Sequence, residues 1–165
     1  MQSKGGAVMT MELFEYQRTV PESWLDYNGH MNDGQYSRAF SDAGLVWLAY
    51  LGLSESKVKE LSYTIFTLEN HIVYLNEVFA GDEITIKVRI HNYDEKRMHA
   101  FMTLYNPKDE KCATYEVMYM GMDTKAGRPG PFPEKFEQAV KEYYESQDNS
   151  GKPAEMGRTI GIRRK

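Results

Sequence analysis

The amino-acid sequence predicts an α+β domain in which one antiparallel, five-stranded sheet wraps around one long central helix. Two observations predict this class. A helical apolar stripe follows a single strand-like segment, and four consecutive segments with strand composition follow the stripe. The chain has 165 residues, which is enough for one domain with its own hydrophobic core.

The first strand is expected over residues 13–20, because Pro21 cannot donate to a sheet ladder. A helix should begin after Asn32, whose side chain can cap it, with Gln35 placed as in a capping box and Asp33 suited to the helix dipole. Apolar residues then recur at offsets of three and four, which predicts a mostly buried helix. The stripe comprises Tyr36, Phe40, Ala43, Gly44, Trp47, Leu48 and Leu51, and Val46 and Ala49 widen it.

A charged link over residues 55–60 separates this helix from four expected strands. The strands are expected at residues 63–75, 83–92, 97–105 and 111–122. Prolines then interrupt the pattern, and a short helix is expected over residues 133–144, with its apolar side formed by Phe136, Val140 and Tyr143. The domain is expected to span residues 11–145, after a flexible leader over residues 1–10 and before a polar, disordered tail over residues 146–165.

Composition restricts the classes of function. The net charge is −4, so the bulk composition does not indicate a nucleic-acid-binding protein. Cys112 is the single cysteine, which excludes an intrachain disulfide and a zinc site built from several cysteines, and fits a reducing cytoplasm. The sequence has no apolar run near twenty residues and no signal-peptide pattern, so neither a membrane span nor export is expected.

Residues 26–36 concentrate most of the chemistry in the chain, and they read Asp-Tyr-Asn-Gly-His-Met-Asn-Asp-Gly-Gln-Tyr. Asp26 and His30 stand next to a helix start, and an acid or base there can attack a carbonyl while the helix N-terminus holds the oxyanion. Asp26 could instead open a turn, and His30 could fix the loop through backbone groups. Asn32 is expected to cap the helix, which leaves the backbone N–H of Asp33 free to face an oxyanion.

These features resemble hot-dog-fold acyl-CoA thioesterases of the 4-hydroxybenzoyl-CoA thioesterase type. The resemblance covers residues 13–123 and is carried by Val20-Pro21, Asp26-Tyr27-Asn28-Gly29-His30-Met31-Asn32, Tyr36, Phe40, Tyr74-Leu75 and Gly81-Asp82. Residues 66–71, 74–78 and 94–99 are similar to the betainyl-CoA thioesterases of carnitine breakdown, which also occur fused to L-carnitine dehydrogenase.

The resemblance implies a hot-dog homodimer or tetramer with active sites at the dimer interface, without a metal or a cofactor. The implied reaction is hydrolysis of a short acyl-CoA to the free acid and CoA, for example betainyl-CoA to glycine betaine. Asp26 would activate water or attack the carbonyl directly, and the Asp33 N–H would polarise the thioester. Aromatic and medium-chain acyl groups stay open, and so does a functional association with L-carnitine dehydrogenase.

Further candidates lie outside the motif. Glu69 and His71 share one face of a predicted strand, whereas Phe66, Leu68, Ile72 and Tyr74 take the other face. Glu69 could be a second catalytic carboxylate and His71 a substrate-binding group, or both could form an ion pair at the dimer interface or a solvated face.

Substrate and CoA contacts have candidates of their own. Tyr27, Asn32 and Tyr36 are candidates for substrate binding, and an aromatic box for a trimethylammonium group could draw on Trp24, Tyr27 and Tyr36. Trp47 belongs more naturally to the core. Lys96 and Arg97 could meet the phosphates of CoA or could simply be solvated on a hairpin.

Two other functions are alternatives to hydrolysis. A hot-dog hydratase carries Asn-Pro between its Asp and His, which is absent between Asp26 and His30. A non-catalytic acyl-CoA-binding protein would share the same fold and pocket. Some hot-dog thioesterases use an acid on the helix, and Asp42 is the candidate beyond the first turn.

Overall fold

A computed structural model describes residues 12–165, so the expected leader over residues 1–10 lies outside the described residues. The elements are β1 (Phe14–Thr19), the 3₁₀ turn η1 (Glu22–Trp24), α1 (Asp33–Tyr50), α2 (Glu55–Leu61), β2 (Tyr63–Tyr74), β3 (Glu83–Tyr93), β4 (Arg97–Tyr105), β5 (Lys111–Asp123), β6 (Arg128–Pro129) and α3 (Glu134–Ser146). No helix within residues 12–165 combines the length and the apolarity that a membrane span requires.

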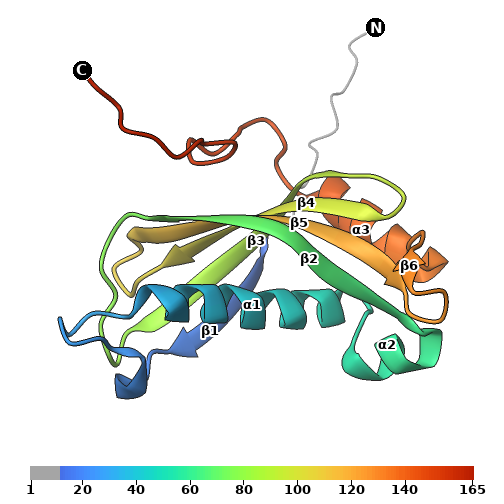
Figure 1. The fold of residues 1–165 in the computed structure, drawn as a ribbon, viewed down its shortest axis with the longest axis horizontal. Coiled ribbons are helices and arrows are strands. Elements are labelled where there is room, and N and C mark those ends of the chain that lie inside the picture. The colour runs from blue at the N-terminus through green and yellow to red at the C-terminus, as the bar shows by residue number, and fades with distance from the viewer. Residues whose placement is uncertain (1–11) are drawn as a thin grey trace, which may run out of the picture.

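The sheet curls around α1, as the sequence predicts (Figure 1). Its strands follow the order β1-β3-β4-β5-β2, and each pair of neighbours is antiparallel. The expected count of five strands is wrong, because β6 adds a sixth by pairing with the end of β5. This strand has only two residues and includes Pro129, so its composition indicates a chain break rather than a strand.

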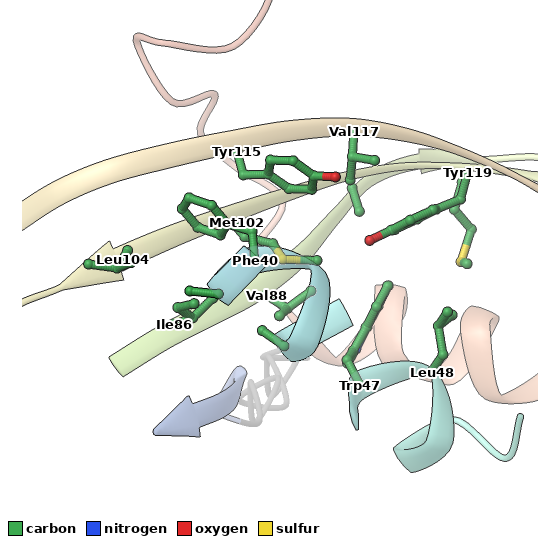
Figure 2. Packing of buried hydrophobic residues seen from close by; sticks show 14 of the residues in the cluster. Phe40, Trp47, Leu48, Ile86, Val88, Met102, Leu104, Tyr115, Val117 and Tyr119 are labelled. Carbon is green, nitrogen blue, oxygen red and sulfur yellow. The ribbon is translucent and has the colours of Figure 1, made fainter. Parts of the chain in front are cut away.

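The long helix begins and buries itself largely as expected. The Asn32 side chain accepts a hydrogen bond from the Gly34 N–H at 2.9 Å, whereas the Asn32 N–H donates to Trp24 O, so the capping box with Gln35 is not formed. Figure 2 shows Phe40 and Trp47 pointing from α1 toward the sheet. The stripe Tyr36, Phe40, Ala43, Gly44, Trp47, Leu48 and Leu51 is buried.

The predicted widening of that stripe is wrong. Val46 is 47% exposed and Ala49 is also exposed, because both lie on the side of α1 that the sheet does not cover. The helix therefore keeps an uncovered apolar side, which includes Leu45.

The charged link after α1 is in fact a helix, α2. Ser54 caps it by accepting from the Lys57 N–H, and the helix carries the ion pairs Lys57–Glu60 and Lys59–Glu55. None of its residues is buried. Val58 and Leu61 are the only apolar residues of this seven-residue helix, and one such pair is too short to show an apolar period, which is why the sequence pattern does not reveal it.

A β-bulge at Leu68 changes the faces of β2. Thr67 pairs with Tyr119 and Glu69 pairs with Met118, so Leu68 is an extra residue on β2. Glu69 and His71 do share a face, as predicted. Their partners on β5 are Met118 and Glu116, which point away from α1 because Tyr119, the neighbour of Met118, contacts α1. The extra residue moves Phe66 to the face of Glu69, so the prediction that Phe66 lies on the opposite face is wrong.

The chain after α3, predicted to be a disordered tail, packs on the sheet as far as Gly157. β1 pairs with β3 up to Val88, and the Gln147 side chain takes the next position by bonding both the N–H and the C=O of Ile90. Further along, Met156 is buried and the Gly157 N–H donates to a Glu116 carboxylate oxygen at 2.8 Å.

We expect Gly44→Ala to destabilise the protein by up to ~2 kcal/mol in urea unfolding. Alanine improves helix propensity by ~1 kcal/mol, but its Cβ would lie 2.7 Å from the Tyr119 hydroxyl oxygen, and such overpacking costs ~1–3 kcal/mol. In a Tyr119→Phe background that oxygen is gone, so the same Gly44→Ala change should become neutral or stabilising. Stabilisation by Gly44→Ala alone would contradict the close packing of α1 on β5.

Candidate active site

A cavity of about 400 Å³ opens at the N-terminus of α1. The loop before α1 and the connection after β2 meet at this end of the sheet (Figure 1), where the Met31 N–H donates to Val78 O at 2.8 Å. Of the predicted site residues, the cavity brings together Asp26, His30, Asp33 and Tyr36. It is lined by Asp26, His30, Met31, Asp33, Tyr36, Tyr74, Leu75, Asn76 and Glu77.

The motif loop is a set of tight turns that presents Asp26 to the cavity. The Asp26 N–H donates to His30 O at 2.9 Å, and the Gly29 N–H donates to Asp26 O at 3.0 Å. Gly29 has a φ of +79°, which a residue with a side chain rarely adopts. The Asn28 N–H donates to one Asp26 carboxylate oxygen at 2.8 Å, so Asp26 both closes a turn and keeps its carboxylate at the cavity.

The start of α1 offers one backbone donor to the cavity. The Gly34 N–H is taken by the Asn32 side chain, and the Gln35 N–H is taken by Asn32 O at 2.9 Å. Among the hydrogen bonds of residues 12–165 there is no acceptor for the Asp33 N–H. This donor sits at the positive end of an 18-residue helix, which is where a developing oxyanion is stabilised.

Two tyrosines form the apolar side of the cavity. The rings of Tyr36 and Tyr74 meet edge to face with centroids 5.1 Å apart, and the Tyr74 hydroxyl donates to Asp33 O at 3.2 Å. Burial raises the pKa of Tyr36 to about 12, and burial followed by the nearby Asp33 charge raises the pKa of Tyr74. Both rings therefore stay neutral and line the cavity as amphipathic surfaces.

Glu77 also lines the cavity, and the sequence did not predict it as a site residue. Its Oε2 lies 3.5 Å from Nε2 of His30, across the junction between the motif loop and the chain after β2. Glu77 is polar, exposed and outside any regular element, so its residue type alone carries no signal. Its position within residues 74–78, which carry part of the family resemblance, is the one sequence feature that could have selected it.

Comparison with known proteins decides the family. The sequence profile of the thioesterase-like superfamily matches residues 20–140. This chain belongs to the thioesterase-like superfamily. The predicted hot-dog fold is thereby confirmed, and a hypothetical protein of Staphylococcus aureus solved in complex with CoA superposes with a TM-score of 0.91 at 36% identity, covering 96% of this chain and 100% of that one.

Two relatives at a similar level of identity have names that include betainyl-CoA thioesterase. The betainyl-CoA thioesterase of Pseudomonas aeruginosa is 30% identical over 155 residues, which cover 93% of this chain and 98% of that protein. The L-carnitine dehydrogenase/betainyl-CoA thioesterase of Agrobacterium fabrum is 32% identical over 145 residues, which cover 88% of this chain. The match spans only 30% of the length of that fused protein.

Other predicted site residues of this thioesterase-like chain lie away from the cavity. Glu69 and His71 line a separate cavity of about 260 Å³ on the sheet face away from α1, where His99 lies 2.8 Å from Glu116. Tyr27 is 97% exposed and is not among the residues that line the cavity at α1.

The remaining candidates have structural partners of their own. Arg97 donates to the Asp94 carboxylate, and with Lys96 it lies at the start of β4, at the opposite end of that strand from the cavity. Asp42 pairs with Arg18 at 2.9 Å, beside β1, so the alternative acid on the helix faces away from the cavity. No cluster of three or more metal-ligating side chains occurs within residues 12–165.

Proposed function

We propose that this chain hydrolyses acyl-CoA thioesters, and that a short cationic acyl group, betainyl, is its preferred substrate. The observation that carries the proposal is that the Asp26 carboxylate and the unpaired Asp33 N–H lie at the same cavity. Membership of the thioesterase-like superfamily supports the hydrolysis, and the CoA bound to the Staphylococcus aureus relative supports a CoA thioester as substrate.

The proposed reaction needs only groups that line the cavity. The thioester carbonyl oxygen accepts a hydrogen bond from the Asp33 N–H, and Asp26 either removes a proton from the attacking water or attacks the carbonyl carbon itself. The negative charge that develops on oxygen in the tetrahedral intermediate stays at the helix N-terminus. The C–S bond then breaks and CoA leaves as a thiolate, which needs little protonation because thiols ionise with a pKa of about 8.5. Attack by water gives the free acid directly, whereas attack by Asp26 leaves a mixed anhydride on its carboxylate, which water then hydrolyses to the acid and free Asp26. The proposal involves no metal and no cofactor.

The charge of the cavity supports a cationic acyl group. Three of its lining residues, Asp26, Asp33 and Glu77, carry carboxylates, and no lysine or arginine lines it. Two tyrosine rings complete a surface that suits a quaternary ammonium group, which cannot donate hydrogen bonds. The likeness to the betainyl-CoA thioesterase of Pseudomonas aeruginosa over nearly the full length of both proteins supports the same substrate.

The proposal includes a homodimer or tetramer in the cytoplasm. β2 is the last strand of the sheet path, and Phe66 and Leu68 on it are 52% and 53% exposed, which supports pairing with a second copy. A sedimentation mass of a single chain would contradict this part.

The buried free thiol of Cys112 fits a reducing compartment. The fused relatives support a functional association with L-carnitine dehydrogenase.

Release of CoA from a panel of thioesters tests the proposal. The purified chain is mixed with betainyl-, acetyl-, medium-chain and aromatic acyl-CoA, and the free thiol is followed with a colorimetric reagent. We expect betainyl-CoA to give a kcat/KM at least ~10-fold above the others, because a neutral acyl group leaves the three carboxylates of the cavity without a cationic partner. Preference for another acyl group would contradict the betainyl assignment alone, and binding of CoA without any hydrolysis would favour a non-catalytic binding protein.

A further inference from the structure

The backbone that carries Glu77 is fixed to two other parts of the fold. The Leu75 N–H donates to Cys112 O at 2.8 Å, and Val78 O accepts from the Met31 N–H at 2.8 Å. Val78 is fully buried, so the chain is held on both sides of Glu77 although Glu77 itself is exposed. The position of this carboxylate therefore does not depend on an unanchored loop.

The Glu77 side chain points toward the motif loop. Its Oε2 lies 3.5 Å from His30 Nε2, and the His30 ring in turn meets Phe79 edge to face, with centroids 5.4 Å apart. The Glu77 carboxylate therefore faces the motif loop beside the cavity, while 61% of its side chain stays open to solvent.

The three carboxylates of the cavity have different surroundings. Asp26 accepts the Asn28 N–H within the motif loop and is the group proposed to act on the carbonyl. Asp33 is the first residue of α1, where its charge interacts with the helix dipole. The Glu77 carboxylate accepts no hydrogen bond among residues 12–165 and faces only the His30 imidazole, so it is tied neither to a turn, as Asp26 is, nor to the helix start, as Asp33 is.

The short length of a betainyl group is consistent with Asp26 acting on the carbonyl while Glu77 faces the cationic end. With the carbonyl oxygen on the Asp33 N–H, a single methylene separates the carbonyl carbon from the quaternary nitrogen. The cationic end therefore stays inside the same cavity, in which Asp26 must approach the carbonyl. A quaternary ammonium needs negative potential and aromatic surface rather than a directed hydrogen bond, and Glu77 with Tyr74 offers both.

We propose that Glu77 is the specificity-determining residue that selects a cationic acyl group by supplying negative charge at its quaternary nitrogen. This inference rests on the proposed function. The Glu77 carboxylate does not act on the carbonyl, so its removal should weaken recognition of the charge and spare the chemistry of hydrolysis.

A pair of substrates with the same shape tests this role. tert-Butylacetyl-CoA replaces the quaternary nitrogen of betainyl-CoA with carbon and removes only the charge. For the full chain we expect kcat/KM to favour betainyl-CoA, and for Glu77→Gln we expect that preference to fall by at least ~10-fold, mainly through KM, because a unit charge is lost a few ångströms from the cation. Activity toward tert-butylacetyl-CoA should stay within about two-fold.

Two further variants separate charge at this position from charge nearby. Glu110→Gln removes an exposed carboxylate from the neighbouring surface hollow, which shares Glu77 but not Asp26, and should leave the preference unchanged. Glu77→Asp keeps the charge and should retain most of the preference. Circular dichroism checks that each variant is folded.

The outcomes distinguish this inference from the proposed function. A retained preference in Glu77→Gln, or an equal loss in Glu110→Gln, overturns the role of Glu77 while hydrolysis of betainyl-CoA stands. Equal activity of the unmodified chain toward both substrates also overturns it. Absence of hydrolysis with every thioester overturns the proposed function, and this inference with it.

Discussion

Asp26→Asn is expected to lower kcat for acyl-CoA hydrolysis by ~10²–10⁴-fold, the usual contribution of a positioned general base or nucleophile. Asparagine keeps a side-chain oxygen that can still accept the Asn28 N–H, so the turn should survive. What is lost is the group that can take a proton or attack a carbonyl. Steady-state release of CoA measures the effect, and the fold is checked by the thermal midpoint.

Asp42→Asn is the matched control for that prediction. Asp42 is the alternative acid that the sequence offers for this role, and the variant makes the same change from a carboxylate to an amide. Asp42 pairs with Arg18 and Arg38 and does not line the cavity, so the variant should keep its rate within about three-fold. An inactive Asp42→Asn together with an active Asp26→Asn would reverse the assignment of the catalytic carboxylate.

Phe40→Ala is expected to reduce the free energy of unfolding by ~3–5 kcal/mol, the typical cost of truncating a fully buried aromatic side chain. Phe40 is fully buried between α1 and the sheet (Figure 2), and its ring stacks on Tyr115 with centroids 5.0 Å apart and planes 10° apart. Truncation removes this contact and leaves a cavity at the centre of the core. Urea unfolding at one fixed protein concentration measures the loss, since assembly makes stability depend on concentration.

Leu45→Ala on the other side of α1 is the control for the core prediction. Leu45 is 66% exposed, so its truncation should change stability by no more than ~0.5 kcal/mol. A loss below about 1 kcal/mol for Phe40→Ala would mean that the helix is not packed as described. A large loss for Leu45→Ala would instead indicate that a second copy of the chain covers this side of α1.

The fold was predictable where one periodic pattern ran over a whole element. The apolar stripe of α1 and the alternation in β3 and β5 each extend over many residues, and the structure reproduces these elements. The bulge at Leu68 was not predictable, because one inserted residue changes faces without changing composition. The helix α2 was missed for a related reason, since it has only two apolar residues, and its Ser54 cap and its ion pairs form no periodic pattern.

The candidate site was predictable only where it is local in sequence. Asp26, His30 and Asp33 lie within eight residues, so one loop and one helix start were enough to associate them. Glu77 reaches the same cavity through a tertiary hydrogen bond between Met31 and Val78, and no local pattern encodes that pairing. The separation of Glu69 from the cavity likewise follows from which face of β2 meets α1.

The hydrogen bonds between the Gln147 side chain and the Ile90 backbone affect how the chain folds during its synthesis. Ile90 is fully buried, and its N–H is satisfied by a side chain 57 residues later in the chain. A ribosome delivers β3 long before it delivers Gln147, so a nascent chain that already holds all the strands still carries unpaired polar groups inside its sheet. Completion of the sheet therefore waits for the synthesis of Gln147, and a chain terminated after α3 would expose this defect to the proteases that remove unfinished proteins.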